Sequence, residues 1–285
     1  MVPVLVFDIE TVPDAEGLRK LWDLDPSVSE AGVIDLASQR RRQATGSDFL
    51  PPHQQKVVAI SCALRSDEGI RVWSLGSAGD AEAEIVKRFF DGLAKYTPQL
   101  VSWNGSGFDL PVLHYRALIH GIPAPTYWDL GENDREFKFN NYISRFHTRH
   151  LDLMDVLAGY QNRAWAPLDE IAQLCGLPGK IGMEGSQVYA AWKRGEIESI
   201  RAYCEIDVAN TYLLYLRFQL IRGALDEGAH AREIQLVREW LGAQDGQHWK
   251  DFNAAWKYAR LPRRGGTACA RSTRPCSRRC ACLPR

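Results

Sequence analysis

An apolar run near the N-terminus, residues 2–7, leads directly into two acids, Asp8 and Glu10. The run is rich in valine and has the length of a buried strand. Residues two apart on a strand share a face, so the two carboxylates point to the same side. Paired carboxylates at the end of a buried strand repel one another unless a cation lies between them. The pattern indicates a site for a hard divalent cation such as Mg²⁺ or Mn²⁺; the alternative is a strand that simply ends in solvated acids.

The composition is that of a globular protein, with 45% apolar and 25% charged residues in a chain of 285. No stretch approaches the roughly 20 apolar residues that a membrane-spanning helix needs. The N-terminal run is too short for the core of a signal peptide, and acids follow it at once. We therefore expect a cytoplasmic protein without a membrane anchor.

Apolar periodicity predicts an α/β fold beyond the first strand. It predicts strands at 51–64, 70–76, 99–105 and 150–160, the last as a strand or a strand-to-helix transition, and helices at 80–96, 110–120, 168–175, 186–193 and 196–222. A turn at 67–69 makes the second and third strands antiparallel, whereas the helix before the fourth strand allows a parallel crossover. One domain with a mixed five-stranded sheet flanked by helices fits this order.

The net charge of zero hides an asymmetry along the chain. Residues 261–285 contain seven Arg and no acid, which leaves 28 basic and 35 acidic residues in 1–260, a net charge of −7. A protein that binds nucleic acid mainly by charge is usually basic. If the acidic body binds nucleic acid, we expect it to do so in a local groove or through bound cations.

Cysteines divide the chain at the same place. Three are isolated in the body of the chain: Cys62, Cys175 and Cys204. Their apolar or helical contexts predict buried, reduced thiols. The other four lie within 269–282, in a segment with almost no large apolar residue. We predict a folded domain over 1–260 and a disordered Arg/Cys-rich tail over 261–285; a zinc-binding or nucleic-acid-binding tail is the alternative.

Two further segments place acids on elements of the predicted fold. In Asn104–Asp109 a strand runs through a small-residue turn into a helix. Asp109 either caps that helix, as acids at this position often do, or faces the first acidic pair. In the last long helix, Tyr203 and Asp207 are four residues apart and share a face. The alternative for this pair is an ordinary helix surface.

In this order, the three acidic segments resemble the three motifs of the DEDD superfamily of 3′–5′ exonucleases. The resemblance extends over residues 2–222 and is strongest to stand-alone proteins similar to the proofreading exonuclease domain of family B DNA polymerases. The subclass with histidine in place of tyrosine has that histidine five residues before the last acid, where this chain has Ala202. The resemblance therefore implies the tyrosine (DEDDy) type and an RNase H-like fold.

The resemblance also implies metal-binding roles. Asp8, Glu10 and Asp207 would ligate a first divalent cation, Mg²⁺ or Mn²⁺. Asp8 would bridge to a second cation, which Asp109 would help to hold, largely through water. Two cations ~3.5–4 Å apart can lower the pKa of an attacking water and stabilise the leaving oxygen. Two such cations also balance the charge of the four acids.

The remaining motif residues are assigned to water and substrate. The resemblance implies that Tyr203 orients the attacking water or helps to deprotonate it. Asn104 and Phe108 would line the nucleotide site.

Three features outside the motifs are further candidates. Asp152 is expected to support the site without binding metal. Lys180 is a weaker candidate for a phosphate contact. The loop 138–149 mixes basic and aromatic residues, and it is either a substrate contact or an ordinary solvated loop.

The implied activity is hydrolysis of phosphodiester bonds from a single-stranded 3′ end, with DNA favoured over RNA. The chain would act alone or with a polymerase or repair protein. The motifs do not separate DNA from RNA, because they contact phosphate and metal and not the 2′-hydroxyl. An exoribonuclease on the same fold and a catalytically silent nucleic-acid-binding module are the alternatives. The intact acids argue against the silent module.

Overall fold

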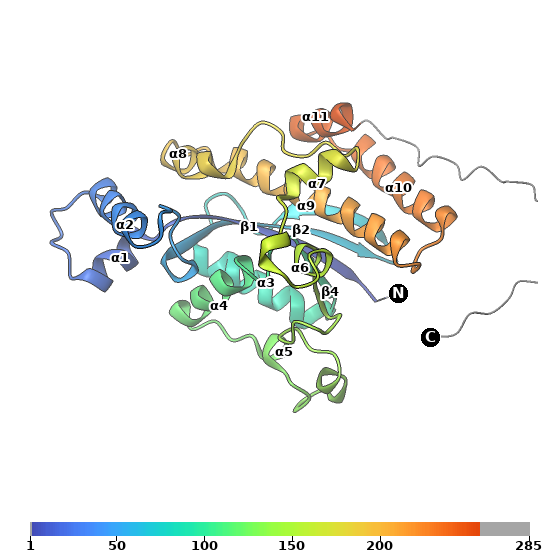
Figure 1. Ribbon diagram of the computed structural model, residues 1–285, viewed down its shortest axis with the longest axis horizontal. Coiled ribbons are helices and arrows are strands. Elements are labelled where there is room, and N and C mark those ends of the chain that lie inside the picture. The colour runs from blue at the N-terminus through green and yellow to red at the C-terminus, as the bar shows by residue number, and fades with distance from the viewer. Residues whose placement is uncertain (1, 257–285) are drawn as a thin grey trace, which may run out of the picture.

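A five-stranded mixed sheet forms the centre of the molecule (Figure 1). The computed structural model describes residues 2–256, so the predicted tail lies outside the described residues. In the spatial order β3-β2-β1-β4-β5, the strands are β3 (Gly69–Ser74), β2 (Gln55–Ser66), β1 (Val4–Pro13), β4 (Gln99–Ser102) and β5 (His150–Asp152). β2 is antiparallel to β1 and β3, whereas β4 is parallel to β1 and β5. The predicted α/β class and RNase H-like fold are confirmed.

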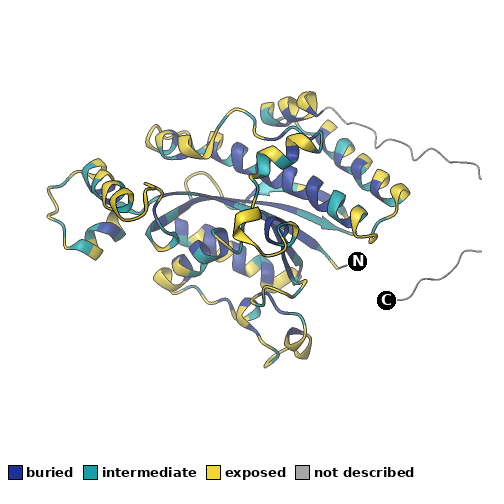
Figure 2. Cartoon of the chain, in the orientation of Figure 1, coloured by how far each residue is buried: buried dark blue, intermediate teal, exposed yellow. Residues whose placement is uncertain are grey.

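Helices cover both faces of this sheet (Figure 2). One face carries α3 (Glu82–Tyr96) and α4 (Asp109–His120), and the other carries α9 (Ile197–Ile221), α10 (Glu227–Gly242) and α11 (Gln247–Ala255). Shorter helices lie in the connections: α5 (Pro125–Trp128), α6 (Leu153–Leu157), α7 (Leu168–Leu174) and α8 (Val188–Lys193). Two more, α1 (Ala15–Trp22) and α2 (Glu30–Thr45), project at one end of the molecule.

The central strand β1 divides its side chains between two cores. Val4 and Val6 pack on the side of α9, whereas Phe7 and its odd-numbered neighbours pack on the side of α3 and α4. This alternation is the ordinary consequence of extended backbone. Asp8 and Glu10 therefore continue the face of β1 that meets α9. The fold itself directs both acids toward the helix that carries Asp207.

The structure decides between two predicted forms of one segment and corrects the prediction for one cysteine. The segment 150–160 is the strand-to-helix transition, because Asp152 ends β5 and accepts a hydrogen bond from the Asp155 amide at the start of α6 (3.3 Å). Cys62 and Cys204 are buried thiols as predicted, but Cys175 is only partly buried because it ends α7 near the surface. Within residues 2–256, the helices are either too short or too polar to cross a membrane.

Candidate active site

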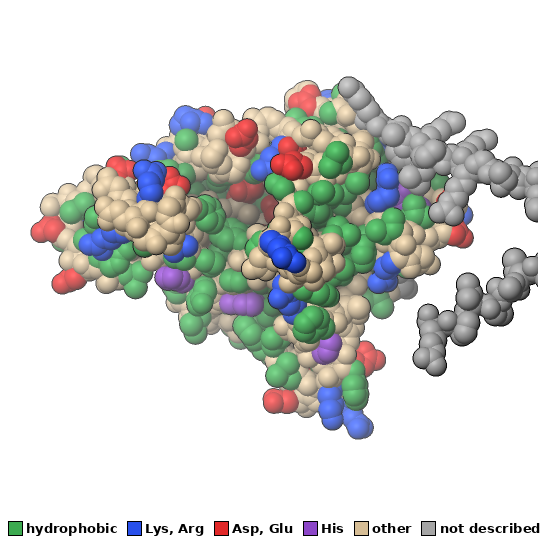
Figure 3. Space-filling view, in the orientation of Figure 1, with side chains coloured by type: hydrophobic (Ala, Val, Ile, Leu, Met, Phe, Trp, Pro, Cys, Tyr) green, Lys and Arg blue, Asp and Glu red, His purple; other side chains and the backbone are tan. Residues whose placement is uncertain are grey.

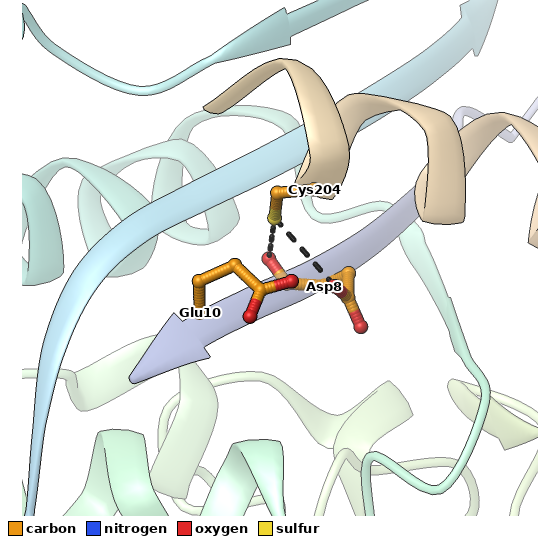
Figure 4. A group of neighbouring side chains, drawn as sticks. All are labelled: Asp8, Glu10 and Cys204. Carbon is orange, nitrogen blue, oxygen red and sulfur yellow. Dashed lines mark hydrogen bonds between the residues drawn. The ribbon is translucent and has the colours of Figure 1, made fainter. Parts of the chain in front are cut away.

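Strand β1 and helix α9 bring the first and third acidic segments together. Glu10, Tyr203 and Asp207 are each less than 10% exposed, and Asp8 is partly exposed. Cys204, on α9, lies directly over Asp8 (Figure 4). Its thiol donates to the Asp8 backbone oxygen (3.4 Å) and to Asp8 Oδ2 (3.5 Å). Ligating atoms of Asp8, Glu10 and Cys204 lie within 4.8 Å of one another.

Helix α4 adds the fourth acid from the opposite side of β1. Asp109 is buried, and its Oδ1 accepts a hydrogen bond from the backbone amide of Ile9 (3.1 Å). Ile9 lies between Asp8 and Glu10, so this bond fixes Asp109 beside the acidic pair. Of the two interpretations of Asp109, the structure supports the one in which it faces that pair.

The charges of the four acids oppose one another. Burial and the neighbouring carboxylates raise the pKa of Asp8 and of Glu10 well above their usual values. Burial raises the pKa of Asp109 to about 7. It also raises the pKa of Asp207 to about 6, although the positive charge of Lys180 acts in the other direction. The cluster is therefore costly to ionise without additional positive charge.

The donor set fits a hard divalent cation. The cluster presents carboxylate oxygens, which are the ligands that Mg²⁺ and Mn²⁺ prefer. Asp207 Oδ1 is buried and has no hydrogen-bond partner among residues 2–256. A buried, unpartnered carboxylate oxygen is expensive, and a coordinated cation removes that cost. Oδ1 of Asp207 is thus available to a ligand, while the Asp207 carboxylate also interacts with the Tyr203 hydroxyl and with the positive charge of Lys180.

Lys180 is the basic residue that counters this cluster. Its positive charge lowers the pKa of both Glu10 and Asp207, and its Nζ lies 5.6 Å from the centre of the Tyr203 ring. Gly179, the residue before Lys180, is held by the fully buried Asn210. The Asn210 Nδ2 donates to the Gly179 oxygen (2.9 Å), and the Asn210 Oδ1 accepts from the Gly179 amide (3.1 Å). Helix α9 thus positions both Asp207 and the loop that carries Lys180.

Asp152 shapes the loop after β4. Its two carboxylate oxygens accept from the amides of Asn104 (3.0 Å) and Ser106 (2.9 Å). Asn104 has φ of 68°, a left-handed conformation that is uncommon outside glycine. Phe108 packs its ring 5.3 Å from the ring of Phe49. Asp152 therefore positions this loop, in agreement with its predicted supporting role.

An open cleft of about 1160 Å³ runs past the acids, and Figure 3 shows acidic side chains at the floor of a hollow in this face. Its lining includes Asp8, Asp207, Lys180 and Asn104.

Tyr203 borders a neighbouring hollow of about 560 Å³. Burial and the adjacent carboxylates raise the pKa of Tyr203, so its phenol stays protonated in this setting.

Residues 47–256 match a family described as a predicted 3′–5′ exonuclease related to the exonuclease domain of PolB. The chain belongs to this family. It is also 28% identical over 166 residues to a DNA polymerase of Archaeoglobus fulgidus. That alignment covers 57% of this chain and 20% of the polymerase, so the chain matches about a fifth of this relative's length.

The family confirms the predicted resemblance to a polymerase-type exonuclease domain. The matched residues include Asp109, Tyr203 and Asp207 but begin after β1. The family match therefore does not cover Asp8 and Glu10, which the geometry of the structure places beside Asp109 and Asp207. The roles assigned to individual residues of this exonuclease-family site stay predictions. Cys204 and Asn210 were not predicted as site residues, and their sequence context, an apolar helix, gives no sign of it.

Proposed function

We propose that this chain is a metal-dependent 3′–5′ exonuclease that removes nucleotides from a single-stranded end, with DNA as the favoured polymer. The observation that carries the proposal is the convergence of four acids from β1, α4 and α9 beside an open cleft, with one buried oxygen unpartnered. Membership in an exonuclease family supports the reaction class. The relative named as a DNA polymerase favours DNA.

The acids would hold two divalent cations. Asp8, Glu10 and Asp207 would ligate one, and Asp8 with Asp109 would hold the other. When bound, such cations supply an activated water and stabilise the leaving oxygen. The protein's own contribution is to fix the four acids: the Ile9 amide holds Asp109, and the Cys204 thiol holds Asp8.

Tyr203 would orient the attacking water. Its phenol is buried against the carboxylates, which favour its protonated form. A protonated phenol can donate a hydrogen bond but is a poor base. Lys180, which lies near the ring, would offset negative charge as the phosphate enters.

The polymer and the direction of cutting can be tested in one assay. A 5′-labelled oligonucleotide, offered as single-stranded DNA, RNA or duplex, should shorten from its 3′ end in Mg²⁺ or Mn²⁺ and stay intact in EDTA. We expect single-stranded DNA to be cut fastest. Faster cutting of RNA would favour the exoribonuclease alternative. Binding without shortening in either metal would contradict the enzyme and favour the silent module.

Tyr203→Phe should retain measurable activity. The substitution keeps the ring and removes only the hydroxyl, so the cations and the strand should still bind. We expect kcat to fall roughly 10- to 100-fold with little change in KM, because one oriented hydrogen bond to the water is lost. Single-turnover kinetics on single-stranded DNA would measure this. A loss as large as that of a metal ligand would mean that Tyr203 does more than orient water.

A further inference from the structure

Exposed aromatic rings gather beside the cleft on the segments that flank α6. Phe146, Tyr160 and Trp165 are 74%, 36% and 39% exposed. Arg145 and Arg163 lie on the same segments. These five residues are called the aromatic patch. Grouped exposed rings are unusual on a soluble surface and indicate an interaction site. Figure 3 shows basic and hydrophobic side chains around α6, next to the acidic hollow.

The patch is held in place by buried groups. The Arg145 guanidinium donates to both oxygens of the buried Asp155 (2.6 Å each) and lies 5.2 Å from the centre of the Tyr160 ring. The rings of Phe146 and Tyr160 are 5.1 Å apart. Tyr160 has φ of 62°, a strained conformation for a residue with a side chain.

The patch is continuous with the cleft. Trp165 borders the cleft that contains Asp8 and Asp207. It also borders an adjoining cavity of about 410 Å³, which Arg145 and Asn104 line. A strand that leaves the acids through this cleft would meet Trp165, and Arg145 connects the adjoining cavity to the Tyr160 ring.

Segment 138–165 exposes cations but no acid. Within 138–165 the two acids, Asp152 and Asp155, are buried and hydrogen-bonded. The basic side chains of the same segment are Lys138, Arg145, Arg149 and Arg163. The exposed cations of this segment are Lys138, Arg163 and the ion-paired Arg145, because the Arg149 side chain is only 11% exposed. Arg163 can therefore contact a phosphate, although Asp169 and Glu170 line the cleft that Trp165 borders.

We propose that the aromatic patch binds the nucleotides upstream of the cleaved bond, stacking unpaired bases on its rings and contacting phosphates through Arg163. This inference rests on the proposed function, because it extends the substrate of that site. Aromatic platforms with nearby cations bind single strands without sequence preference. A base-paired strand would not offer its base faces, so the patch favours unpaired ends.

The test compares a long and a minimal substrate in the double variant Phe146→Ala/Tyr160→Gly. Glycine relieves the left-handed backbone at 160, so lost binding cannot be ascribed to strain. For an oligonucleotide of about 12 nucleotides, kcat/KM should fall and Kd in EDTA should rise, each roughly 10- to 100-fold. Hydrolysis of a nitrophenyl ester of thymidine 5′-monophosphate, which has no upstream nucleotide, should keep its wild-type rate.

A second variant tests the charge. Arg163→Gln removes an exposed cation whose side chain bonds only Gln161 among the described residues. The slope of log Kd against log salt should decrease by about 0.7, the value for one phosphate contact on a single strand. An unchanged slope would remove Arg163 from the proposal.

Tyr96→Ala is the matched control. Tyr96 is an exposed ring with the Lys95 ammonium 4.9 Å from its centre, and it borders a cavity that shares no residue with the cleft. The Tyr96→Ala substitution should change kcat/KM for neither the oligonucleotide nor the nitrophenyl ester. An equal loss on both substrates in the double variant, or no loss on either, would overturn the proposal. If the wild type cuts neither substrate, the proposed function fails, and the Kd comparison alone decides the patch.

Discussion

Asp207→Asn should abolish exonuclease activity while leaving the fold intact. The substitution keeps the size of the side chain but replaces a charged ligand with a neutral amide. Metal ions contribute several kcal/mol of transition-state stabilisation, so weakening one cation's ligation should cost ~10³-fold or more in kcat/KM. Oδ1 of Asp207 is buried and has no hydrogen-bond partner among the described residues, so few hydrogen bonds within the protein should change. The measurement is the rate of 3′ shortening of single-stranded DNA in saturating Mg²⁺.

Glu205→Gln is the matched control for this prediction. Glu205 is on the same helix, two residues away, but it points elsewhere and accepts from Ser74 Oγ (2.8 Å) and pairs with His248 Nε2 (3.0 Å). The same acid-to-amide change at this position should alter the rate by about 2-fold or less, as expected for a site outside the cluster. Similar losses in both variants would indicate a defect of helix α9 and would contradict a metal-binding role for Asp207.

The orientation of the acids could be predicted from the sequence because it depends on local geometry. Two-residue periodicity places Asp8 and Glu10 on one face of β1, and four-residue spacing places Tyr203 and Asp207 on one face of α9. The structure adds that these are the faces that meet. Motif order supplied the rest of the prediction, since it associated Asp109 with the same site.

Contacts between distant segments could not be predicted in this way. Cys204 approaches Asp8 across 196 positions, and Asn210 holds Gly179 across 31. Both contacts depend on how α9 packs on the sheet, and neither residue type indicates it.

Helices α10 and α11 were missed for a different reason. Their buried residues, such as Ile234, Val237 and Leu241, do have helical spacing, but the helical prediction ended at residue 222.

Metal removal should make the stability of the protein depend on pH through this cluster. The folded-state pKa values of Asp109 and Asp207 are raised to about 7 and about 6, above the usual 3.8. Such groups contribute stability below the unfolded pKa, and this contribution is lost as pH rises through the folded pKa. In EDTA, therefore, their contribution to the free energy of unfolding should decrease between about pH 4 and about pH 8. Mg²⁺ binds the deprotonated acids, so its stabilisation should increase over the same range.

Comparison with Asp207→Asn isolates this effect from the other titrating groups. In EDTA the variant lacks the buried charge, so it should be more stable than the wild type at about pH 8 by ~2–3 kcal/mol, or several degrees in Tm. The difference should shrink as the pH falls toward 4 and should vanish below about pH 3, where Asp207 is protonated in both the folded and the unfolded state. With Mg²⁺ the order should reverse at high pH, because the wild type gains more from the metal. Thermal unfolding across this range measures both effects, and a Tm difference that does not change with pH would mean that Asp207 carries no buried charge in the folded protein.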